Sequence, residues 1–195
     1  MEQKVKNKVL IISGPTGSGE TTITTEIIEK YPCFQRLVAA TSRPIRSGEE
    51  EQINYYYLGK EKFLEEIENE NIIEYTYIQN RDTYYGTYKP DLEKKIKDSH
   101  VIANVDYVGV KYFKENYDAL AIFIKPSSLE VIENRLRTRN PETTDQEIKR
   151  RLKNAEDEIN SEQHLYDFVV INDDGKLNEA VEEVRKILKS KSYIQ

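Results

Sequence analysis

Short apolar runs alternate along this chain with stretches of helical periodicity. The runs are continuous and rich in β-branched or aliphatic residues, which is typical of strands buried on both faces of a parallel sheet. They cover residues 9–13, 37–40, 101–106, 119–124 and 168–171. Because strands and helices take turns, the pattern predicts an α/β domain of three layers around a central parallel sheet.

Sequence signals also predict where helices begin. Ser127 and Glu130 have the spacing of a capping box, and so do Thr144 and Glu147, which precede a polar helix that runs towards residue 163. Near the C-terminus, apolar residues recur at helical spacing over residues 177–188. We expect this last helix to pack its apolar side on the sheet.

Two segments interrupt the alternation. Residues 42–87 are rich in Tyr, Glu and Asn, with strand-like pieces at 55–58 and 72–77 around a helix at 60–69. Residues 135–151 are so polar that they have too little apolar surface to join the core, so they form either a solvated excursion or a mobile lid. We therefore expect one domain over residues 1–195, and its predicted parts are a core of 5–41, 88–134 and 164–192, a small mixed α/β insertion at 42–87 and a helical lid at 135–163.

Composition narrows the class of protein. Charged residues make up 33% of the chain, and 29 basic against 35 acidic residues give a net charge of −6, which argues against a nucleic-acid groove. The longest apolar run, 119–124, is too short to cross a membrane. Cys33 is the single cysteine and the first six residues have no apolar stretch of a secretory signal, so we expect a cytoplasmic protein. His100 and His164 are too few to indicate a metal site.

The first candidate for chemistry is a glycine-rich loop between the first strand and an apolar helix. Residues 14–21 read Gly-Pro-Thr-Gly-Ser-Gly-Glu-Thr, which matches the phosphate-loop pattern except at its lysine. In such a loop, backbone N–H groups and the start of the helix bind phosphate oxygens, and Thr21 is placed to hold Mg²⁺. The residues expected to bind ATP here are Gly14, Pro15, Thr16, Gly17, Ser18, Gly19, Glu20, Thr21 and Thr22.

Glu20 stands where the pattern has its lysine. At an effective dielectric constant of about 20, one pair of unit charges 4 Å apart is worth roughly 4 kcal/mol, so the exchange changes the local charge balance by several kcal/mol. Three interpretations fit the sequence. The site is catalytically dead, or Glu20 points away from the phosphates while another cation takes the place of the lysine, or Glu20 helps to hold the metal. The sequence does not choose among them.

A second set of motifs follows in order. Residues 41–49 contain Arg43 and Arg46, three positions apart, which form a plausible fork for one phosphate monoester. Asn54-Tyr55 comes next, and further matches follow at residues 72–75, 83–87, 104–106 and 109–110. Together with the loop, these motifs resemble guanylate kinases over residues 8–188, nearly the whole chain.

The resemblance implies a P-loop fold and transfer of a phosphoryl group from ATP to GMP with Mg²⁺, giving ADP and GDP in purine nucleotide metabolism. It implies that Glu74 accepts hydrogen bonds from guanine N1–H and the 2-amino group, that Asp106 lies near the 2-amino group, and that Thr87 donates to O6. The implied contacts of the acceptor phosphate are Arg43, Arg46, Tyr55 and Tyr85. The implied lid arginines are Arg135, Arg139 and Arg151, and Asn172 is the implied contact on the adenine side.

Two positions depart from the family pattern. Asn104 stands where the family usually has a first aspartate, and Ala39 where a base-contacting serine is common. The competing hypothesis is a kinase-shaped, non-catalytic module that binds GMP or a phosphorylated protein ligand, which Glu20 favours. The retained arginines and acceptor set favour the enzyme, and Glu74 with Asp106 disfavours another nucleoside monophosphate kinase. We expect GMP and ATP as partners, no nucleic acid or membrane, and a monomer or homodimer.

Overall fold

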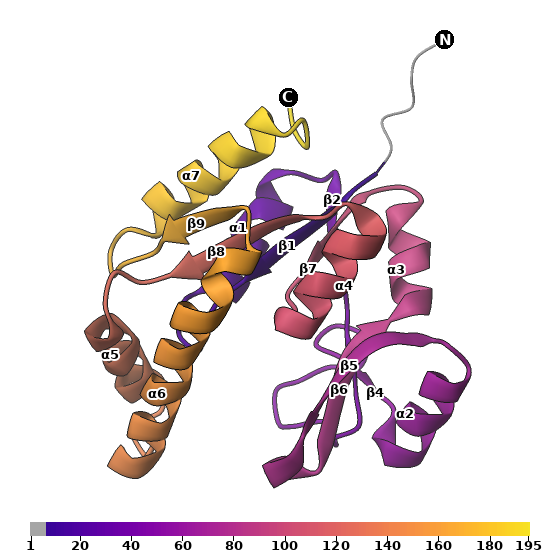
Figure 1. Ribbon diagram of the computed structural model, residues 1–195, viewed down its shortest axis with the longest axis horizontal. Coiled ribbons are helices and arrows are strands. Elements are labelled where there is room, and N and C mark those ends of the chain that lie inside the picture. Colours follow the sequence, from indigo (N-terminus) through magenta and orange to yellow (C-terminus); the bar gives the residue numbers. More distant parts are fainter. Residues whose placement is uncertain (1–6) are drawn as a thin grey trace. The chain divides into compact units, whose positions relative to one another are not determined.

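A computed structural model describes residues 7–195 as a mixed α/β structure (Figure 1). The chain divides into two compact units. The first combines the described residues up to Val9 with Cys33–Ala119, and the second combines Leu10–Pro32 with Leu120–Gln195. Residues 5 and 6 of the predicted core, and the whole N-terminal stretch on which the absence of a secretory signal was argued, lie outside the described residues.

Parallel strands form the centre of the second unit. Strand β1 (Val9–Ser13) pairs with β8 (Leu120–Lys125), which pairs with β9 (Phe168–Ile171), and both pairings are parallel. All five residues of β1 are buried, as its continuous apolar run predicts. Helix α7 (Leu177–Ser190), yellow in Figure 1, lies along β9 and buries the apolar side that its spacing predicts.

Three more helices complete this unit. Helix α1 (Glu20–Lys30) follows the glycine-rich loop, and α5 (Leu129–Arg139) lies beside α6 (Asp145–Glu162), which ends in the 3₁₀ turn η2 (Gln163–Leu165). Between α5 and α6 is a small separate core formed by Ile132, Leu136, Ile148 and Ala155. The polar stretch 135–151 therefore has enough apolar residues to close a hairpin of helices.

One of the two predicted helix starts is confirmed and the other is wrong. The Thr144 hydroxyl accepts from the backbone N–H of Glu147 at 3.3 Å and caps α6. Helix α5 begins one residue later than its predicted box, with Ser128 as N-cap and no side-chain capping bond. Ser127 lies outside the helix because its backbone N–H donates to Asp173 Oδ1 at 2.8 Å.

The first unit contains two pieces of sheet. Strand β2 (Phe34–Arg36) pairs in parallel with β7 (His100–Ala103). A separate mixed sheet has the strand order β4-β3-β6-β5, and its strands are β3 (Ala40–Thr41), β4 (Tyr56–Tyr57), β5 (Ile72–Ile78) and β6 (Thr83–Tyr88). The helical segments of this unit are α2 (Gly59–Glu68), η1 (Gln79–Arg81), α3 (Lys89–Ile96) and α4 (Tyr107–Tyr117).

The predicted strand at residues 37–40 is wrong. The chain leaves the parallel sheet after Arg36 and enters the mixed sheet at Ala40. In between, the backbone N–H of Val38 donates to the carboxylate of Asp91 at 2.9 Å rather than to a neighbouring strand. The run is apolar because Leu37 and Val38 are buried, so burial alone produced the strand-like pattern.

The predicted strand at 101–106 ends earlier than its apolar pattern. Strand β7 stops at Ala103, and Asp106 is the N-cap of α4. Within the second unit, the parallel strands have the hydrogen-bonded order β1-β8-β9. No helix among residues 7–195 combines the length and apolar character that crossing a lipid bilayer requires.

A β-bulge in β5 decides which way its side chains face. The pairing with β6 shifts register between Ile72, which faces Tyr88, and Tyr75, which faces Gly86. Ile72 and Tyr75 therefore share the side that packs on Phe63 of α2. A Cβ on Gly86 would lie 2.6 Å from the backbone oxygen of Glu74, so only glycine fits opposite the bulge.

Candidate functional site

The bulge turns Glu74 and its alternate neighbours into a cavity of the first unit. Its volume is about 240 Å³. Glu74, Thr76 and Ile78 of β5 line it together with residues of β6 and of the segment after β7. The remaining lining residues are Ala39, Tyr55, Tyr85, Gly86, Thr87, Asn104, Val105 and Asp106. The structure thus gathers five predicted site residues, which are Tyr55, Glu74, Tyr85, Thr87 and Asp106, around one cavity.

Glu74 is the most perturbed acid of this cavity. Its pKa is raised from 4.5 to about 7, chiefly by burial and also by the nearby negative charge of Asp106, while hydrogen bonds from Thr87 act in the opposite direction. The Thr87 hydroxyl donates to Glu74 Oε1, and Thr87 itself is fully buried. Glu74 is half-buried, and few groups of the protein donate hydrogen bonds to its carboxylate. Such a carboxylate is suited to accept hydrogen bonds from a ligand that presents N–H groups.

Asp106 is fixed on both of its oxygens. Oδ1 accepts from the backbone N–H groups of Val108 at 3.0 Å and Gly109 at 3.3 Å, which caps α4. Oδ2 accepts from the Thr76 hydroxyl at 2.5 Å. Helix capping and the Thr76 bond together hold the carboxylate at the rim of the cavity in one orientation.

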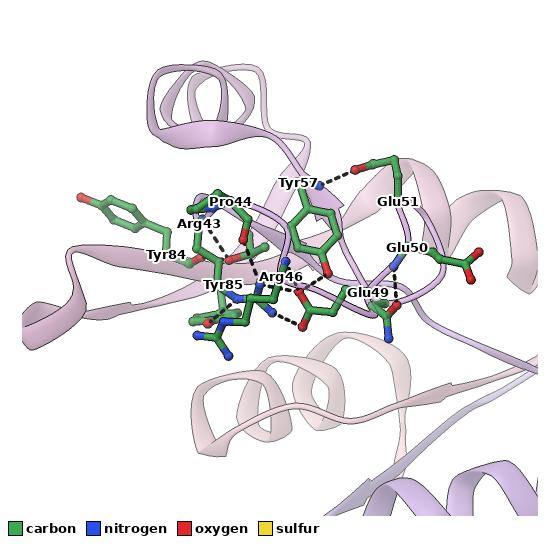
Figure 2. Close-up of polar contacts among 11 residues, drawn as sticks. Arg43, Pro44, Arg46, Glu49, Glu50, Glu51, Tyr57, Tyr84 and Tyr85 are labelled. Atoms are coloured by element: carbon green, nitrogen blue, oxygen red, sulfur yellow. Dashed lines mark hydrogen bonds and ion pairs between the residues drawn. The ribbon is translucent and has the colours of Figure 1, made fainter.

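Arg43 lies next to this cavity, in the loop after β3, and is only 8% exposed. Its two terminal nitrogens donate to the two oxygens of Glu49, each at 2.7 Å (Figure 2). Its Nε donates to the Tyr85 hydroxyl at 3.1 Å, and Nη1 also donates to the Pro44 carbonyl at 3.0 Å. Arg43 therefore contacts the wall of the cavity through Tyr85, while its guanidinium forms an ion pair with Glu49 of the same loop.

The other two predicted phosphate contacts differ in exposure. Arg46 is exposed, and its backbone N–H donates to Glu49 Oε2 at 2.9 Å. Tyr55 is half-buried, burial raises the pKa of its hydroxyl, and its ring meets that of Tyr85 edge to face at 5.6 Å. Neither arginine lines the cavity, so the predicted fork is adjacent to it rather than part of its wall.

The second unit has its own cavity, of about 590 Å³, beside the glycine-rich loop. Gly19 caps α1 with φ 88°, and a Cβ there would lie 2.5 Å from Asn172 Nδ2. The predicted ATP-binding residues that line this cavity are Gly17, Gly19, Glu20, Thr21, Thr22 and Asn172, and the predicted lid arginines Arg135 and Arg139 line it as well. Gly14, Pro15, Thr16 and Ser18 belong to the loop without lining it.

Glu20 is the first residue of α1 and faces this cavity. Its Oε2 accepts from the Ser18 hydroxyl at 2.6 Å, and its Oε1 lies 3.5 Å from the donating Thr21 hydroxyl. The carboxylate therefore lies at the positive end of the helix, where an anion is stabilised. It occupies the end of the loop that, in other phosphate loops, meets the nucleotide's phosphates.

Arg135 and Asn172 tie the loop to the segment after β9. Arg135 donates from Nη1 to the carbonyls of Gly17 at 2.9 Å and Ser18 at 3.3 Å, from Nη2 to the Asn172 carbonyl at 2.9 Å and from Nε to Asp174 at 2.8 Å. Asn172 donates from Nδ2 to the Ser18 carbonyl at 2.7 Å. Its buried Oδ1 has no hydrogen-bond partner among the described residues, and Asn172 lines the cavity.

The remaining two lid arginines differ in whether they line the cavity of the second unit. Arg139 is exposed and lines the cavity. Arg151 is engaged elsewhere, since its Nε donates to Glu147 at 2.8 Å. Arg150 donates to the same carboxylate, and these hydrogen bonds lower the pKa of Glu147 to about 2.

The residues that hold the predicted site residues were missed in the sequence. Thr76 had a usable signal, because it lies two positions after Glu74 in a strand and therefore on the same face. Glu49 and Tyr57 had no signal in the sequence, because the folding of the loop brings them together. The Tyr57 hydroxyl donates to Glu49 at 2.9 Å. Asp174, which pairs with Arg135, lay in the predicted adenine-side segment without an assigned role.

No group of three or more His, Cys, Asp or Glu residues is arranged to bind a metal within residues 7–195. A Mg²⁺ ion that travels with a nucleotide does not need such a group, because phosphate oxygens and waters fill most of its coordination sphere. Thr21, whose hydroxyl is at the cavity beside the Glu20 carboxylate, offers the hard oxygen that such an ion takes from the protein. The residues present therefore fit Mg²⁺.

Comparisons with known proteins agree on one family. The family model for guanylate kinase matches residues 6–191. The guanylate kinase of Prochlorococcus marinus is 36% identical over 185 residues, 94% of this chain and 97% of the relative. That of Porphyromonas gingivalis is 38% identical over 185 residues, 93% of this chain and 96% of the relative. The crystal structure of guanylate kinase from Anaplasma phagocytophilum superposes with a TM-score of 0.72 at 28% identity, covering 96% of this chain and 87% of the other. With its sequence motifs, its fold and these relatives in agreement, the chain belongs to the guanylate kinase family.

Proposed function

We propose that this chain transfers the γ-phosphoryl group of ATP to GMP, giving ADP and GDP, and that it does so in the cytoplasm. The observation that supports GMP as the acceptor is the pair of carboxylates, Glu74 and Asp106, in one cavity of about 240 Å³. Guanine presents two adjacent donors, N1–H and the 2-amino group, whereas adenine presents a ring acceptor in the first of these places. Carboxylates therefore select guanine over adenine at this edge.

On the acceptor side, Glu74 receives the N1–H and 2-amino protons, and Asp106 adds an acceptor near the 2-amino group. Thr87 donates to O6 when it leaves its bond to Glu74. Tyr55, Tyr85, Arg43 and Arg46 orient the phosphate. No covalent intermediate is needed, because the work of such an enzyme is positioning and charge stabilisation.

On the donor side, the loop's backbone N–H groups and the start of α1 bind the phosphates of ATP. Asn172, which lines the cavity and whose Oδ1 has no hydrogen-bond partner among the described residues, accepts from the 6-amino group of adenine once a small movement exposes that oxygen. Arg139 is the lid arginine that supplies positive charge to this cavity, and Arg135 holds the loop in shape. Bound through Thr21, Mg²⁺ would neutralise charge on the phosphates.

The second candidate function is a binding module without turnover, and Glu20 is the observation that favours it. Its carboxylate lies where phosphates approach the start of α1 and repels them. Such a module would keep the GMP cavity or use the exposed Arg46 for a phosphorylated protein ligand. The donor cavity with Arg139 and Asn172 argues for the enzyme, since a module that binds only an acceptor does not need it.

The experiment that separates these functions is coupled ADP release on the natural chain with GMP, AMP, UMP and CMP. We expect turnover with GMP alone, and calorimetry should show GMP binding in the absence of ATP. GMP binding without ADP release over hours would identify the module. Turnover with AMP equal to that with GMP, or no binding of GMP, would contradict the assignment of Glu74 and Asp106.

The pKa of Glu74 predicts a pH dependence for recognition of the base. Because the folded protein raises this pKa to about 7, the ionised acceptor is lost as the pH falls through 7. Guanosine affinity should therefore drop about tenfold between pH 8 and pH 6, which follows from the ionised fraction of a group with this pKa. Guanosine is the right probe because the phosphate of GMP titrates in the same range.

Titration calorimetry of guanosine at pH 6, 7 and 8 measures this effect, and a Glu74→Gln variant provides the control with a flat profile. Equal affinities at all three pH values in the natural chain would contradict this pH dependence.

The raised pKa of Glu74 also affects the stability of the fold. Glu74 favours the folded state most below its ordinary pKa of 4.5, and this contribution is lost as the pH rises through 7.

A further inference from the structure

Glu49 is the most heavily used acceptor in the loop after β3. Its carboxylate accepts four hydrogen bonds, from both terminal nitrogens of Arg43, the backbone N–H of Arg46 and the Tyr57 hydroxyl, at 2.7 to 2.9 Å. Figure 2 shows the Arg43 and Tyr57 side chains pointing towards this carboxylate. The hydrogen bonds from Arg43 lower the pKa of Glu49 to about 2, so the carboxylate stays charged at every pH at which the protein would work.

This arrangement consumes the planar fork of Arg43. Of the five N–H donors of its guanidinium, Nε bonds to Tyr85, the two on Nη1 reach Glu49 and Pro44, and one on Nη2 reaches Glu49. One N–H on Nη2 is left for a ligand. The rings of Tyr55 and Tyr57 also contact Arg43, with their centroids 5.2 Å and 5.3 Å from its guanidinium carbon. The hydrogen bonds and these two rings together hold the guanidinium in position.

We propose that Glu49 is a positioning residue of the acceptor-phosphate site: it locks Arg43 so that Arg43 orients the Tyr85 hydroxyl, and leaves the exposed side chain of Arg46 to meet the phosphate. This inference rests on the proposed function of the first unit. Since the Tyr85 oxygen accepts from Arg43 Nε, its own proton points elsewhere and is available to an anion. Of the two arginines that the sequence predicted to grip the phosphate together, Arg43 is then fixed by Glu49, and the side chain of Arg46 is exposed.

A different role, in which the phosphate displaces Glu49 from Arg43, is disfavoured by the same contacts. Displacement would leave the Arg46 N–H and the Tyr57 hydroxyl without their acceptor, in addition to separating a bidentate ion pair. A carboxylate held by three separate residues, two in the loop and Tyr57 in β4, is part of the framework of the site. Replacing it should weaken phosphate binding, whereas replacing a competitor would strengthen it.

The test compares GMP with guanosine, which has the same base and no phosphate, on the full chain by calorimetry. In Glu49→Gln we expect the Kd of GMP to rise at least tenfold and the Kd of guanosine to change less than twofold. Steady-state kinetics should show a raised KM for GMP. The matched control is Glu50→Gln, because Glu50 is exposed and its carboxylate points away from Arg43 in Figure 2; both constants should stay at the natural values.

Tyr57→Phe provides a second variant if Glu49→Gln does not fold, since it removes one of the four donors and keeps the ion pair. We expect a rise of two- to fivefold in the Kd of GMP alone. Unchanged or tighter GMP binding in either folded variant overturns the positioning role while the proposed function stands. If the natural chain binds neither GMP nor guanosine, the proposed function fails and this inference fails with it.

Discussion

A Glu20→Lys variant should have a kcat/KM for ATP at least a hundredfold higher than that of the natural chain. The reason is charge: the Glu20 carboxylate lies at the start of α1, bonded to the Ser18 hydroxyl at 2.6 Å, where the phosphates of a nucleotide are bound. Each unit pair of charges there is worth roughly 4 kcal/mol at an effective dielectric constant of about 20, and the exchange turns repulsion into attraction. Exposure to solvent reduces this figure, and a hundredfold corresponds to about 2.7 kcal/mol.

Coupled ADP release at saturating GMP measures this effect, with ATP varied. The matched control is Glu26→Lys, which makes the same charge change at an exposed position of the same helix and should leave kcat/KM within twofold. A Glu20→Lys variant within threefold of the natural chain would show that Glu20 does not oppose ATP binding. Strong activity in the natural chain combined with a loss in the variant would instead indicate that Glu20 helps to hold the metal.

The second large effect concerns the base. Glu74→Gln should lower kcat/KM for GMP about a thousandfold, because an amide replaces a charged acceptor and turns an N–H group towards two guanine donors. Hydrogen bonds to a charged group are worth about 1.5–3 kcal/mol, and an unpaired buried group costs about 1–3 kcal/mol more. The Thr87 hydroxyl, which donates to Glu74, would still find the amide oxygen, so the variant keeps that contact when it folds.

Inosine monophosphate sharpens this test because it keeps N1–H and lacks the 2-amino group. The natural chain should prefer GMP over it, and Glu74→Gln should reduce that preference. Glu68→Gln, at an exposed site near the end of α2, is the control and should keep the natural kinetics. A loss of less than tenfold in the Glu74→Gln variant would show that another group reads this edge of the base.

The sequence alone determined the family, most of the central parallel strands and the kinds of side chain at both sites. These are local properties: a glycine-rich turn between a buried strand and a helix, or an arginine pair around a proline, is written in consecutive residues. Strands β1 and β9 and helices α6 and α7 follow their patterns for the same reason, since an element that is buried on one side or both carries apolar residues at a regular spacing in consecutive positions.

The directions and partners of these side chains depended on the tertiary structure. Simple alternation from Ile72 would have placed Glu74 on the α2 side, and only the bulge opposite Gly86 turns it into the cavity. The pairing of Arg43 with Glu49, and of Arg135 with the loop carbonyls, arises from segments folded back on each other. A one-residue shift in register or a long-range hydrogen bond leaves no periodic pattern in the sequence. The sequence motifs therefore identified which side chains form the sites, whereas the contacts of those side chains could be assigned only from the tertiary structure.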